Sequence, residues 1–454
     1  MIDIKDDSRK IKKGDTFIAL RGISSDGHSY VDTAIKNGAT KVIVEEGEYE
    51  VTTLKVEDTR EYLKKYLFEK YLPLISKMKL IGITGTNGKT TCAYLVQKLL
   101  NNIGSKTAYI GTIGYYIDEK KMSLSNTTPD LCLLYELLMD AYNNGCENVV
   151  MEISSEGLAM GRAEGLEFDY AAFTNLTPEH LNYHKTMENY ALAKQLLFKR
   201  LRNDKVAIIN ADDKYSDYFL LDGNKNITYG KNKGDYQLVN YEVDGITHFE
   251  YEISKENKTV KSRTKLLGEY NLYNVMLVFA LLNEMGYENF DKYLYELEAP
   301  KGRMQCIDYN GLKVIVDYAH TPDALVKALE VIRTIVKGKI YTVIGATGER
   351  DVANRPITGE IATTLSDYVI FTNDSPKGED EMKILNDLRS NVKRKNHETI
   401  VERAEAIDHG LTLLGKDDCL VILGKGHEEF VEIKGVKLPF NDCDYVINKK
   451  KLCK

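Results

Sequence analysis

The clearest chemical signal in the sequence is a short string of glycine, threonine and lysine between an apolar run and an amphipathic segment. The apolar run is Leu80–Ile83, and the amphipathic segment has apolar residues at positions 92, 95, 96, 99 and 100. A strand, a glycine loop and a helix in this order direct backbone N–H groups at an anion, while the lysine reaches phosphates and a threonine hydroxyl binds Mg²⁺. The string is Gly85, Thr86, Asn87, Gly88, Lys89, Thr90 and Thr91. We interpret it as a nucleoside triphosphate site.

The string is a variant of the strict phosphate-loop pattern. That pattern has glycine where this chain has Ile83, and here an additional glycine, Gly82, precedes it. The alternative interpretation is an ordinary glycine-rich turn between a strand and a helix. Lysine and threonine at the start of a helix in this context favour the nucleotide site.

Acidic and histidine side chains follow two further predicted strands. Glu152 ends the apolar strand Asn148–Glu152, and a carboxylate at the carboxyl end of a strand beside the phosphate loop is suited to Mg²⁺. The alternative is a strand-terminal glutamate that faces water. His180 and His184 follow the strand Ala171–Asn175 together with Glu179; they could bind a metal ion, although their spacing matches no zinc pattern.

Four apolar strands in the last third of the chain each lead into a polar loop. The strands are Lys313–Val316, Ile340–Ile344, Tyr368–Thr372 and Cys419–Leu423, and the loops are 317–322, 345–351, 373–377 and 424–428. In a doubly wound parallel sheet all four loops emerge at one edge, where ligands bind. We therefore expect a second ligand-binding edge here.

The elements that must position these residues indicate an α/β protein. Residues 1–75 predict a small α/β unit with strands Asp15–Leu20 and Thr40–Glu45 and a helix at Tyr30–Asn37, and Pro73 is interpreted as a linker. From residue 80 to 298 strands and helices alternate, with a helix at Leu131–Asn143. A further domain begins near Lys301. A chain of 454 residues fits about three domains at ~150 residues each.

Composition excludes several classes of function. The net charge is -7, and the basic run Lys449–Lys451 is only three residues long, so nothing indicates a nucleic-acid partner. No apolar run approaches the ~18 residues of a membrane span, and the N-terminus does not resemble a signal peptide. Seven scattered cysteines without CxxC pairs predict reduced thiols in a cytoplasmic protein.

Taken together and in order, the motifs resemble the Mur ligase family, and within it the branch that acts on UDP-N-acetylmuramoyl-dipeptide, the MurE branch. The resemblance extends from Asp7-Ser8-Arg9 through nearly the whole chain. The strings that carry it are GTNGKTT (85–91), NTTPD (126–130), EISS (152–155), FTNLTPEHLNYHKTMENYALAK (173–194), GEYNLYN (268–274), KGRMQ (301–305), DYAHTPDAL (317–325) and GKGHE (424–428). The family implies three α/β domains: a small UDP-binding domain (1–75), a central P-loop ATPase-type domain with a mostly parallel sheet (76–299), and a C-terminal Rossmann-like domain with a doubly wound sheet (300–454).

The resemblance also implies the reaction. ATP would phosphorylate a carboxylate of UDP-MurNAc-L-Ala-D-Glu, an amine would attack the acyl phosphate, and ADP and phosphate would leave, as a step of peptidoglycan precursor synthesis. We favour meso-diaminopimelate as the amino acid, with L-lysine or another amino acid as the alternative. We expect a cytoplasmic monomer that binds the UDP-MurNAc-dipeptide and an amino acid, without nucleic acid and without membrane insertion.

Site residues carried over from the family fall into five groups. The catalytic residues are Lys89, His180 and Lys194, and the magnesium ligands are Thr90, Glu152, His180 and Lys194. The nucleotide is held by residues 85–91 with Asn271, Arg303, Asp317 and His320. The UDP-peptide is held by Ser8, Asn126, Thr127, Thr128, Ser154 and Arg162, and the amino acid by Arg355, Asp374, Lys377, Gly424 and Glu428.

Lys194 matches a lysine that the family carbamoylates with CO₂. An ammonium near two Mg²⁺ ions would be repelled by ~4 kcal/mol per unit charge at 4 Å and an effective dielectric constant of ~20. A carbamate converts that cation into an anionic ligand, which is our hypothesis for the modification. The alternative is an ordinary lysine on a helix face.

Several positions depart from the family pattern. Glu156 stands where the branch usually has histidine and Met160 where it has glutamine, while Glu179 and Asn182 replace aspartates. In the run from Asp374 to Lys377 the diaminopimelate enzymes have Asp-Asn-Pro-Arg. Lys377 keeps the cation and loses the bidentate fork of arginine.

Two other functions stay open at this stage. A ligase related to folylpolyglutamate synthase shares the phosphate loop and the Rossmann-like domain, but the Asp-Ser-Arg unit and the NTTPD string argue against it. A catalytically silent paralogue that binds the UDP-peptide is the other; the presence of Lys89, Glu152, His180 and Lys194 argues against it.

Overall fold

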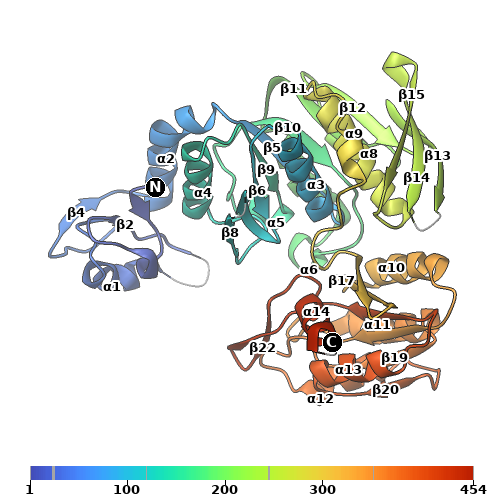
Figure 1. The fold of residues 1–454 in the computed structure, drawn as a ribbon. Helices are drawn as coiled ribbons and strands as arrows, with labels where there is room; N and C mark the ends of the chain where they lie inside the picture. The colour runs from blue at the N-terminus through green and yellow to red at the C-terminus, as the bar shows by residue number, and fades with distance from the viewer. Residues whose placement is uncertain (1, 23–25, 119, 244–245, 351, 453–454) are drawn as a thin grey trace. The chain divides into compact units, whose positions relative to one another are not determined.

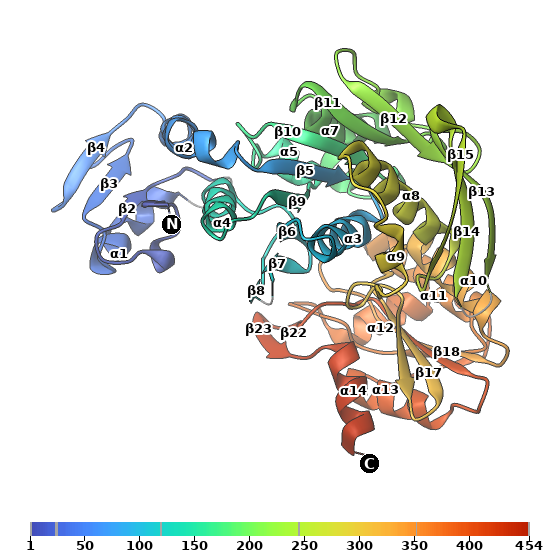
Figure 2. The same ribbon diagram turned by 45° about the horizontal axis from the view of Figure 1, so that its top comes forward.

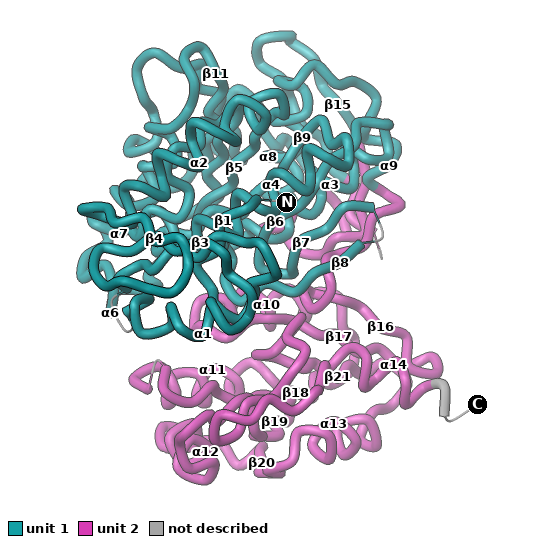
Figure 3. The backbone as a smooth tube through the Cα atoms, turned by 90° about the vertical axis from the view of Figure 1, so that its left-hand side faces the viewer, with its two compact units in different colours: residues 1–240, 249–261, 272–294 teal, residues 241–248, 262–271, 295–454 magenta. Residues whose placement is uncertain are grey.

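The computed structural model describes residues 2–22, 26–118, 120–243, 246–350 and 352–452 of the chain (Figure 1). It separates into two compact units, which Figure 3 distinguishes by colour. The first unit comprises Met1–Asn240, Phe249–Lys261 and Leu272–Leu294, and the second comprises Tyr241–His248, Ser262–Asn271 and Tyr295–Lys454. The domain boundaries at residues 75 and 299 stay predictions.

The N-terminal part of the first unit is a small parallel sheet. Its strands are β1 (Ile4–Lys5), β2 (Thr16–Ile18), β3 (Lys41–Val44) and β4 (Thr52–Lys55), paired in that order. The short helix α1 (Val31–Lys36) lies between β2 and β3 in the chain, where sequence predicted a helix. The predicted small α/β unit is therefore present in the structure.

The linker predicted at Pro73 is wrong, because Pro73 lies inside the helix α2 (Thr59–Ile75). Asp58 begins this helix by accepting hydrogen bonds from the N–H groups of Arg60 and Glu61. Leu63, Leu67, Tyr71 and Ile75 are buried along one face at a spacing of four residues. Proline costs only one intrahelical hydrogen bond near the helix end, and the apolar face outweighs that cost.

The central sheet of the first unit places the phosphate-binding strand in its middle. Strand β5 (Lys79–Thr84) lies between β9 (Asn148–Glu152) and β10 (Phe168–Phe173), and both pairings are parallel. Among the described residues the strand order is β15-β14-β13-β12-β11-β10-β5-β9-β6-β7-β8. The other strands are β6 (Thr107–Gly111), β7 (Gly114–Ile117), β8 (Lys120–Met122), β11 (Leu201–Asn210), β12 (Lys225–Gly230), β13 (Tyr236–Val243), β14 (Thr247–Ile253) and β15 (Lys258–Thr264).

Helices pack on this sheet where the sequence placed them, as Figure 2 shows. Helix α3 (Lys89–Asn102) contacts β5, β6 and β9, and helix α7 (Met187–Phe198) contacts β5, β10 and β11. The remaining helices along this stretch of the chain are α4 (Leu131–Asn143), α5 (Ser155–Ala159), α6 (Leu181–His184), α8 (Glu269–Glu284) and α9 (Asp291–Leu294). The predicted central, mostly parallel sheet is confirmed.

The second unit contains a doubly wound sheet, as predicted. Strand order among its described residues is β16-β17-β21-β18-β19-β20, and only β16 is antiparallel to its neighbour. The strands are β16 (Gln305–Tyr309), β17 (Leu312–Asp317), β18 (Ile340–Ile344), β19 (Tyr368–Phe371), β20 (His397–Thr399) and β21 (Cys419–Leu423). Because β17, β21, β18 and β19 are parallel, the four polar loops predicted from sequence start at the same edge of the sheet.

Two helical layers cover this sheet. Ile315 packs in one apolar cluster with residues of α10 (Pro322–Ile335) and α12 (Glu381–Arg389), whereas Val314 and Val316 pack in another with α13 (Arg403–Thr412) and α14 (Asp442–Leu452). Successive side chains of a strand point to opposite faces, so the sheet is buried on both. Helix α11 (Arg355–Leu365) completes the first layer, and β22 (Phe430–Ile433) with β23 (Val436–Pro439) forms a separate hairpin.

A buried ion pair joins the loop ends of this sheet. Arg403 donates to both carboxylate oxygens of Asp442 at 2.8 and 2.7 Å, and to the carbonyls of Asn373 and Leu423 at 3.1 and 3.0 Å. Both side chains are buried. The contact connects the ends of β19 and β21 to the start of α14.

Replacing Asp442 by asparagine is expected to lower the free energy of unfolding of the second unit by about 3 kcal/mol, because it leaves a buried guanidinium without its counter-charge. Denaturant unfolding followed by circular dichroism measures the loss. Asp444→Asn is the matched control: Asp444 pairs with Lys301 at 2.8 Å on the surface, where such a pair contributes at most about 1 kcal/mol. Equal losses in the two variants would contradict the assignment.

Candidate active site

The phosphate loop has the backbone geometry that only glycine tolerates. Gly85 and Gly88 have φ angles of 146° and 86°. A Cβ atom on Gly85 would lie 1.8 Å from Thr174 Oγ1, and one on Gly88 would lie 2.3 Å from Asn274 Oδ1. The loop therefore fits tightly against its neighbours and leads directly into the N-terminus of α3, where the positive end of the helix dipole favours an anion.

Lys89 folds back over this loop. Its ammonium donates hydrogen bonds to the carbonyls of Gly85 and Thr86 at 2.8 and 2.7 Å. The N–H groups of Thr86 and Asn87 are bound by Asn175, which follows β10. Asn175 and the Lys89 side chain thus fix the loop, and Lys89 places a positive charge at it.

Glu152 lies beside the loop and is fully buried, which excludes the alternative that it faces water. Thr90 Oγ1 and the Thr112 hydroxyl donate to Glu152 Oε2 at 2.8 and 3.0 Å, while the Thr112 N–H donates at 2.9 Å to Oε1, the other carboxylate oxygen. The Tyr109 hydroxyl also donates to Oε1. A hydroxyl and a carboxylate are the oxygen donors that Mg²⁺ takes, with water completing its shell, so this pair fits the ion.

Lys194 is buried against the other side of the loop. Its ammonium nitrogen lies 2.8 Å from the carbonyl oxygen of Gly85, the same atom that Lys89 contacts, and 4.5 Å from the centre of the Tyr190 ring. Burial first, and the charge of Lys89 second, lower the pKa of Lys194 well below its ordinary value. Both effects favour the neutral amine, the form of lysine that can act as a nucleophile.

His180 lies near Glu156 and Glu179, two of the positions at which this chain departs from the family pattern. It adopts a left-handed backbone conformation with φ of 55°. Its Nδ1 lies 3.3 Å from a carboxylate oxygen of Glu156, and its Nε2 lies 3.8 Å from Glu179. The sequence indicated Glu156 only as a departure and Glu179 also as a possible metal ligand; the structure brings both to His180.

His184 occupies a separate, buried position. Its Nε2 lies 2.9 Å from Ser155 Oγ, and its ring stacks on that of Tyr190 with centroids 5.0 Å apart. Burial, first of all, lowers its pKa and so favours the neutral imidazole. Among the described residues no three histidine, cysteine or acidic side chains are grouped so as to hold a metal ion. The predicted ligands thus form a Thr90–Glu152 pair with His180 and Lys194 at separate contacts.

Several residues predicted to bind the UDP-peptide form one network next to Glu152. Thr128 Oγ1 accepts from the N–H of Ser154 at 2.9 Å and donates to the carbonyl of Glu152 at 3.1 Å. Arg162 donates to the carbonyl of Thr128, and the hydroxyl of Thr127 lies 3.0 Å from that of Thr112. The other two predicted residues lie elsewhere: Ser8 is buried in the small N-terminal sheet region, and Asn126 is exposed.

Four predicted nucleotide residues belong to the second unit. Asp317 ends β17 and accepts from the N–H groups of Met304 and Ala319 at 2.7 and 2.9 Å; desolvation raises its pKa, and the nearby Arg303 opposes the rise. The guanidinium of Arg303 lies 4.5 Å from the Tyr318 ring centre. The carbonyl of Tyr318 accepts a hydrogen bond from His320 Nδ1 at 2.8 Å, and Asn271 donates to the carbonyl of Leu267.

Arg355 is buried and already bound to carboxylates. It forms a bidentate pair with Glu379 at 2.8 and 2.9 Å and a third bond to Asp387 at 3.0 Å. This contact lowers the pKa of Glu379 to about 2. Sequence reasoning assigned Arg355 to the amino acid and missed both partners, because neither belongs to a recognisable motif. A substrate carboxylate at Arg355 would compete with them.

The remaining amino-acid residues meet at the loop edge. Gly424 has φ of 105°, and a Cβ atom there would lie 2.8 Å from Asp374 Oδ2. Lys377 also has a positive φ, and its N–H and carbonyl are bound by Glu432 and Lys434 of the β22–β23 hairpin. Lys425, which sequence reasoning did not select, is buried between Asp374 and Glu428.

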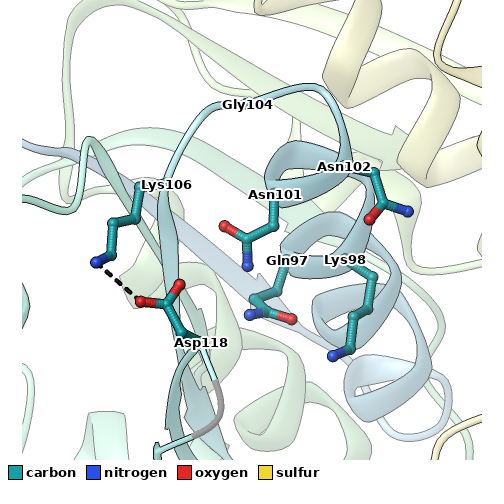
Figure 4. Close-up of a pocket in the computed structure, with 7 residues that line it drawn as sticks. All are labelled: Gln97, Lys98, Asn101, Asn102, Gly104, Lys106 and Asp118. Carbon is teal, nitrogen blue, oxygen red and sulfur yellow. Dashed lines mark ion pairs between the residues drawn. The ribbon is translucent and has the colours of Figure 1, made fainter.

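A polar pocket at the C-terminal end of α3 contains none of the predicted site residues (Figure 4). The Lys106–Asp118 ion pair, 2.9 Å long, closes one side of it. Its lining consists of Gln97, Lys98, Asn101, Asn102, Gly104, Lys106 and Asp118.

In the part of the chain that the structure describes, no helix has the length and apolarity needed to cross a bilayer.

A phosphate loop on a mostly parallel sheet, followed by a doubly wound sheet with a loop-lined edge, defines a multidomain nucleotide-binding α/β enzyme. Three family models match in succession: the Mur ligase family catalytic domain at residues 3–83, the Mur ligase middle domain at 83–282, and the Mur ligase glutamate ligase domain at 302–426. The chain belongs to the Mur ligase family, whose members are ligases, as its motifs predicted.

Similar proteins carry names from one branch of the family. Relatives from Cytophaga hutchinsonii and Fusobacterium nucleatum, each 39% identical over 451 residues, are named UDP-N-acetylmuramoyl-L-alanyl-D-glutamate--2,6-diaminopimelate ligase; the alignments cover 96% and 97% of this chain and 92% of each relative. The match to the MurE branch is thereby confirmed.

Solved structures support the fold. A structure of a UDP-N-acetylmuramoyl-L-alanyl-D-glutamate--2,6-diaminopimelate ligase matches with a TM-score of 0.67 and 31% identity over 99% of this chain and 94% of that one. MurF ligase from Thermotoga maritima in complex with ADP has a TM-score of 0.72 at 20% identity, covering 99% and 97%. Folylpolyglutamate synthase from Mycobacterium tuberculosis, at 16% identity and a TM-score of 0.66, covers 80% of this chain and 91% of its own. The last two likenesses concern the fold alone.

Proposed function

We propose that this chain adds meso-diaminopimelate to UDP-N-acetylmuramoyl-L-alanyl-D-glutamate in an ATP-dependent step of peptidoglycan precursor synthesis. The observation that carries the proposal is the 39% identity, over nearly the full length, to relatives named for that reaction. The phosphate loop with Lys89 supports it, because acyl activation by ATP needs positive charge at the transferred phosphoryl group.

The proposed reaction has two steps. A carboxylate oxygen of the dipeptide attacks the γ-phosphorus of ATP, the bond to the β–γ bridging oxygen breaks, and ADP leaves. The amine nitrogen then attacks the acyl carbon, phosphate leaves with the C–O electron pair, and the nitrogen loses a proton. Lys89 and the N-terminus of α3 would stabilise the charge that develops on the phosphoryl oxygens. Mg²⁺, when bound by Thr90 and Glu152, would neutralise the same charge.

Lys194 and His180 would act at the same loop. The neutral amine of Lys194 can add to CO₂, forming the N–C bond of a carbamate and releasing one proton. The product is an anion where an ammonium would repel both Lys89 and a metal ion. His180, with a carboxylate near each ring nitrogen, would serve as a metal or phosphate ligand.

The remaining predicted residues would hold the substrates. Those around Glu152 would bind the peptide end of the UDP-dipeptide, and Ser8 the UDP end. Asn271, Arg303, Asp317 and His320 would bind ATP. Asp374, Lys377, Gly424 and Glu428 would bind the amino acid, with Arg355 supporting their loop through Glu379.

Replacing Lys377 by arginine is expected to lower the KM for meso-diaminopimelate by about tenfold. A guanidinium binds a carboxylate through two parallel hydrogen bonds, and each charge-assisted bond contributes roughly 1.5 kcal/mol. The hairpin contacts of Lys377 use only its backbone, so the substitution should leave the loop unchanged. Steady-state kinetics with L-lysine, which lacks the distal carboxylate, is the control. An equal gain for both amino acids would contradict the role of position 377.

The function is tested by phosphate release from ATP with Mg²⁺ and UDP-MurNAc-L-Ala-D-Glu, adding meso-diaminopimelate, L-lysine or L-ornithine in turn. We expect release that depends on meso-diaminopimelate, with the tripeptide product identified by mass spectrometry. Phosphate release only with L-lysine would contradict meso-diaminopimelate as the substrate and would leave the proposed reaction unchanged. Silence with all three, while ATP and the UDP-peptide bind, would favour the catalytically silent paralogue.

A further inference from the structure

The loop edge of the second unit contains a buried lysine that the proposed reaction leaves without a role. Lys425 follows Gly424 directly after β21, and its side chain has no exposed surface. Its ammonium donates to Glu428 Oε2 at 3.0 Å and to the carbonyl of Phe430 at 2.7 Å. Asp374 Oδ1 lies 3.6 Å away. A buried ammonium is costly unless it is paired, so its retention at a ligand-binding edge requires a reason.

Asp374 and Glu428 come from different loops, and Lys425 is the cation that they share. Asp374 follows β19, whereas Glu428 follows β21. Asp374 is 3% exposed, and among the described residues its Oδ1 has no hydrogen-bond partner. A buried acceptor in this state points to a donor that a ligand supplies. The formal charges of Asp374, Glu428 and Lys425 sum to one negative charge at this edge of the sheet, which favours binding of a cationic group.

We propose that Lys425 is a positioning residue for the incoming amino acid: its ammonium holds the carboxylates of Asp374 and Glu428 where both accept hydrogen bonds from one amino group. The inference rests on the proposed function and adds a residue to its amino-acid site. Lys425 touches the two carboxylates and not the substrate. Arg403 stabilises the same two loops by donating to the carbonyls of Asn373 and Leu423, the residues before Asp374 and Gly424.

The proposal predicts a separation between the substrates. In Lys425→Met the two carboxylates lose their shared cation, and the KM for meso-diaminopimelate rises about 30-fold or more, as when one partner of a buried charged pair is removed. The KM values for ATP and for the UDP-dipeptide stay within about threefold. Lys416→Met, at an exposed lysine of the same unit, is the matched control and changes none of them.

A pH profile distinguishes this role from a merely structural one. Burial, and then Asp374, raise the pKa of Glu428, whereas Lys425 lowers it. Removing the ammonium therefore raises that pKa further, and less Glu428 is ionised at neutral pH. The rise of kcat/KM for the amino acid with pH moves to higher pH in Lys425→Met. The charged and titratable groups around Glu428 are Lys425, Asp374, His320, Arg403 and Tyr318.

Two further variants keep the test decisive. Lys425→Arg retains the charge and changes its geometry, so the amino-acid KM rises while the pH profile stays near that of the wild type. Glu428→Gln tests the same pair without emptying a buried position, and it raises the amino-acid KM alone. Thermal unfolding by circular dichroism verifies that each variant is folded.

The outcomes separate the two proposals. A wild-type chain without amino-acid-dependent phosphate release overturns the proposed function and this inference with it. An active wild type whose folded Lys425→Met or Glu428→Gln variant keeps its amino-acid KM and pH profile overturns the role of Lys425 alone. KM values that rise equally for all three substrates also overturn it, because they show a general loss of structure.

Discussion

Replacing Lys194 by alanine is expected to lower kcat for phosphate release by about a thousandfold, the scale of removing one group that stabilises charge during phosphoryl transfer. The side chain is buried, contacts the carbonyl of Gly85 together with Lys89, and has a pKa well below its ordinary value. A neutral amine next to an ammonium can take up CO₂, whereas an ordinary lysine ammonium cannot. The proposed carbamate would give the metal site a second anionic ligand beside Glu152.

The Lys194→Arg variant distinguishes a role of the positive charge from a role of the carbamate. Arginine keeps a cation and forms no carbamate, so this variant should lose as much activity as Lys194→Ala. Lys199→Ala, at the exposed end of the same helix, is the control and should retain full activity. A ¹³C resonance from labelled bicarbonate, present in the wild type and absent from the Lys194 variants, reports the carbamate directly. Full activity of Lys194→Arg would contradict the hypothesis.

The strands that position the site could be predicted from the sequence because they are short and apolar. Asn148–Glu152, Ile340–Ile344 and Cys419–Leu423 were predicted to the residue, since each is bounded by polar or glycine residues. Parallel pairing then follows from the alternation with helices, and it brings the loops to one edge. Local pattern and global fold agree along this part of the chain.

Helix α2 could not be predicted in the same way. Its buried face consists of Leu63, Leu67, Tyr71 and Ile75, but charged and aromatic residues between them mask the period, and Pro73 suggested a break. Proline marks a helix boundary only where packing does not compensate for the missing N–H. Here one apolar face, buried along its whole length, decides the structure.

The partners of the buried arginines Arg355 and Arg403 could not be predicted from the sequence for a different reason. Glu379, Asp387 and Arg403 contact their partners over 24 to 39 residues of sequence. No spacing rule connects residues that lie on different helices and loops. The side chains that carry the chemistry stay predictions from the sequence, and the structure adds the charges that hold Arg355 in place.

Replacing Glu152 by glutamine is expected to lower kcat by about a thousandfold and to raise the Mg²⁺ concentration needed for half-maximal rate by about tenfold. The carboxylate is buried next to the phosphate loop and accepts hydrogen bonds from Thr90, Thr112 and Tyr109. Glutamine has nearly the same shape: its oxygen can take the Thr112 N–H, and its NH₂ group can donate to the Thr90 hydroxyl, which rotates. The fold should therefore survive, with a change in unfolding free energy of about 1 kcal/mol.

The loss would then come from the metal, because Mg²⁺ binds an anionic oxygen much more strongly than a neutral amide. Binding of Mn²⁺ with an ATP analogue, followed by electron paramagnetic resonance, measures this without turnover and should weaken in Glu152→Gln. Glu147→Gln is the matched control, since Glu147 precedes the same strand, is exposed and accepts only from Ser105 Oγ among the described side chains. Unchanged Mn²⁺ affinity in Glu152→Gln would assign Glu152 to the hydrogen-bond network of Thr90 and Thr112 instead, and the ion to other oxygen atoms of the nucleotide site.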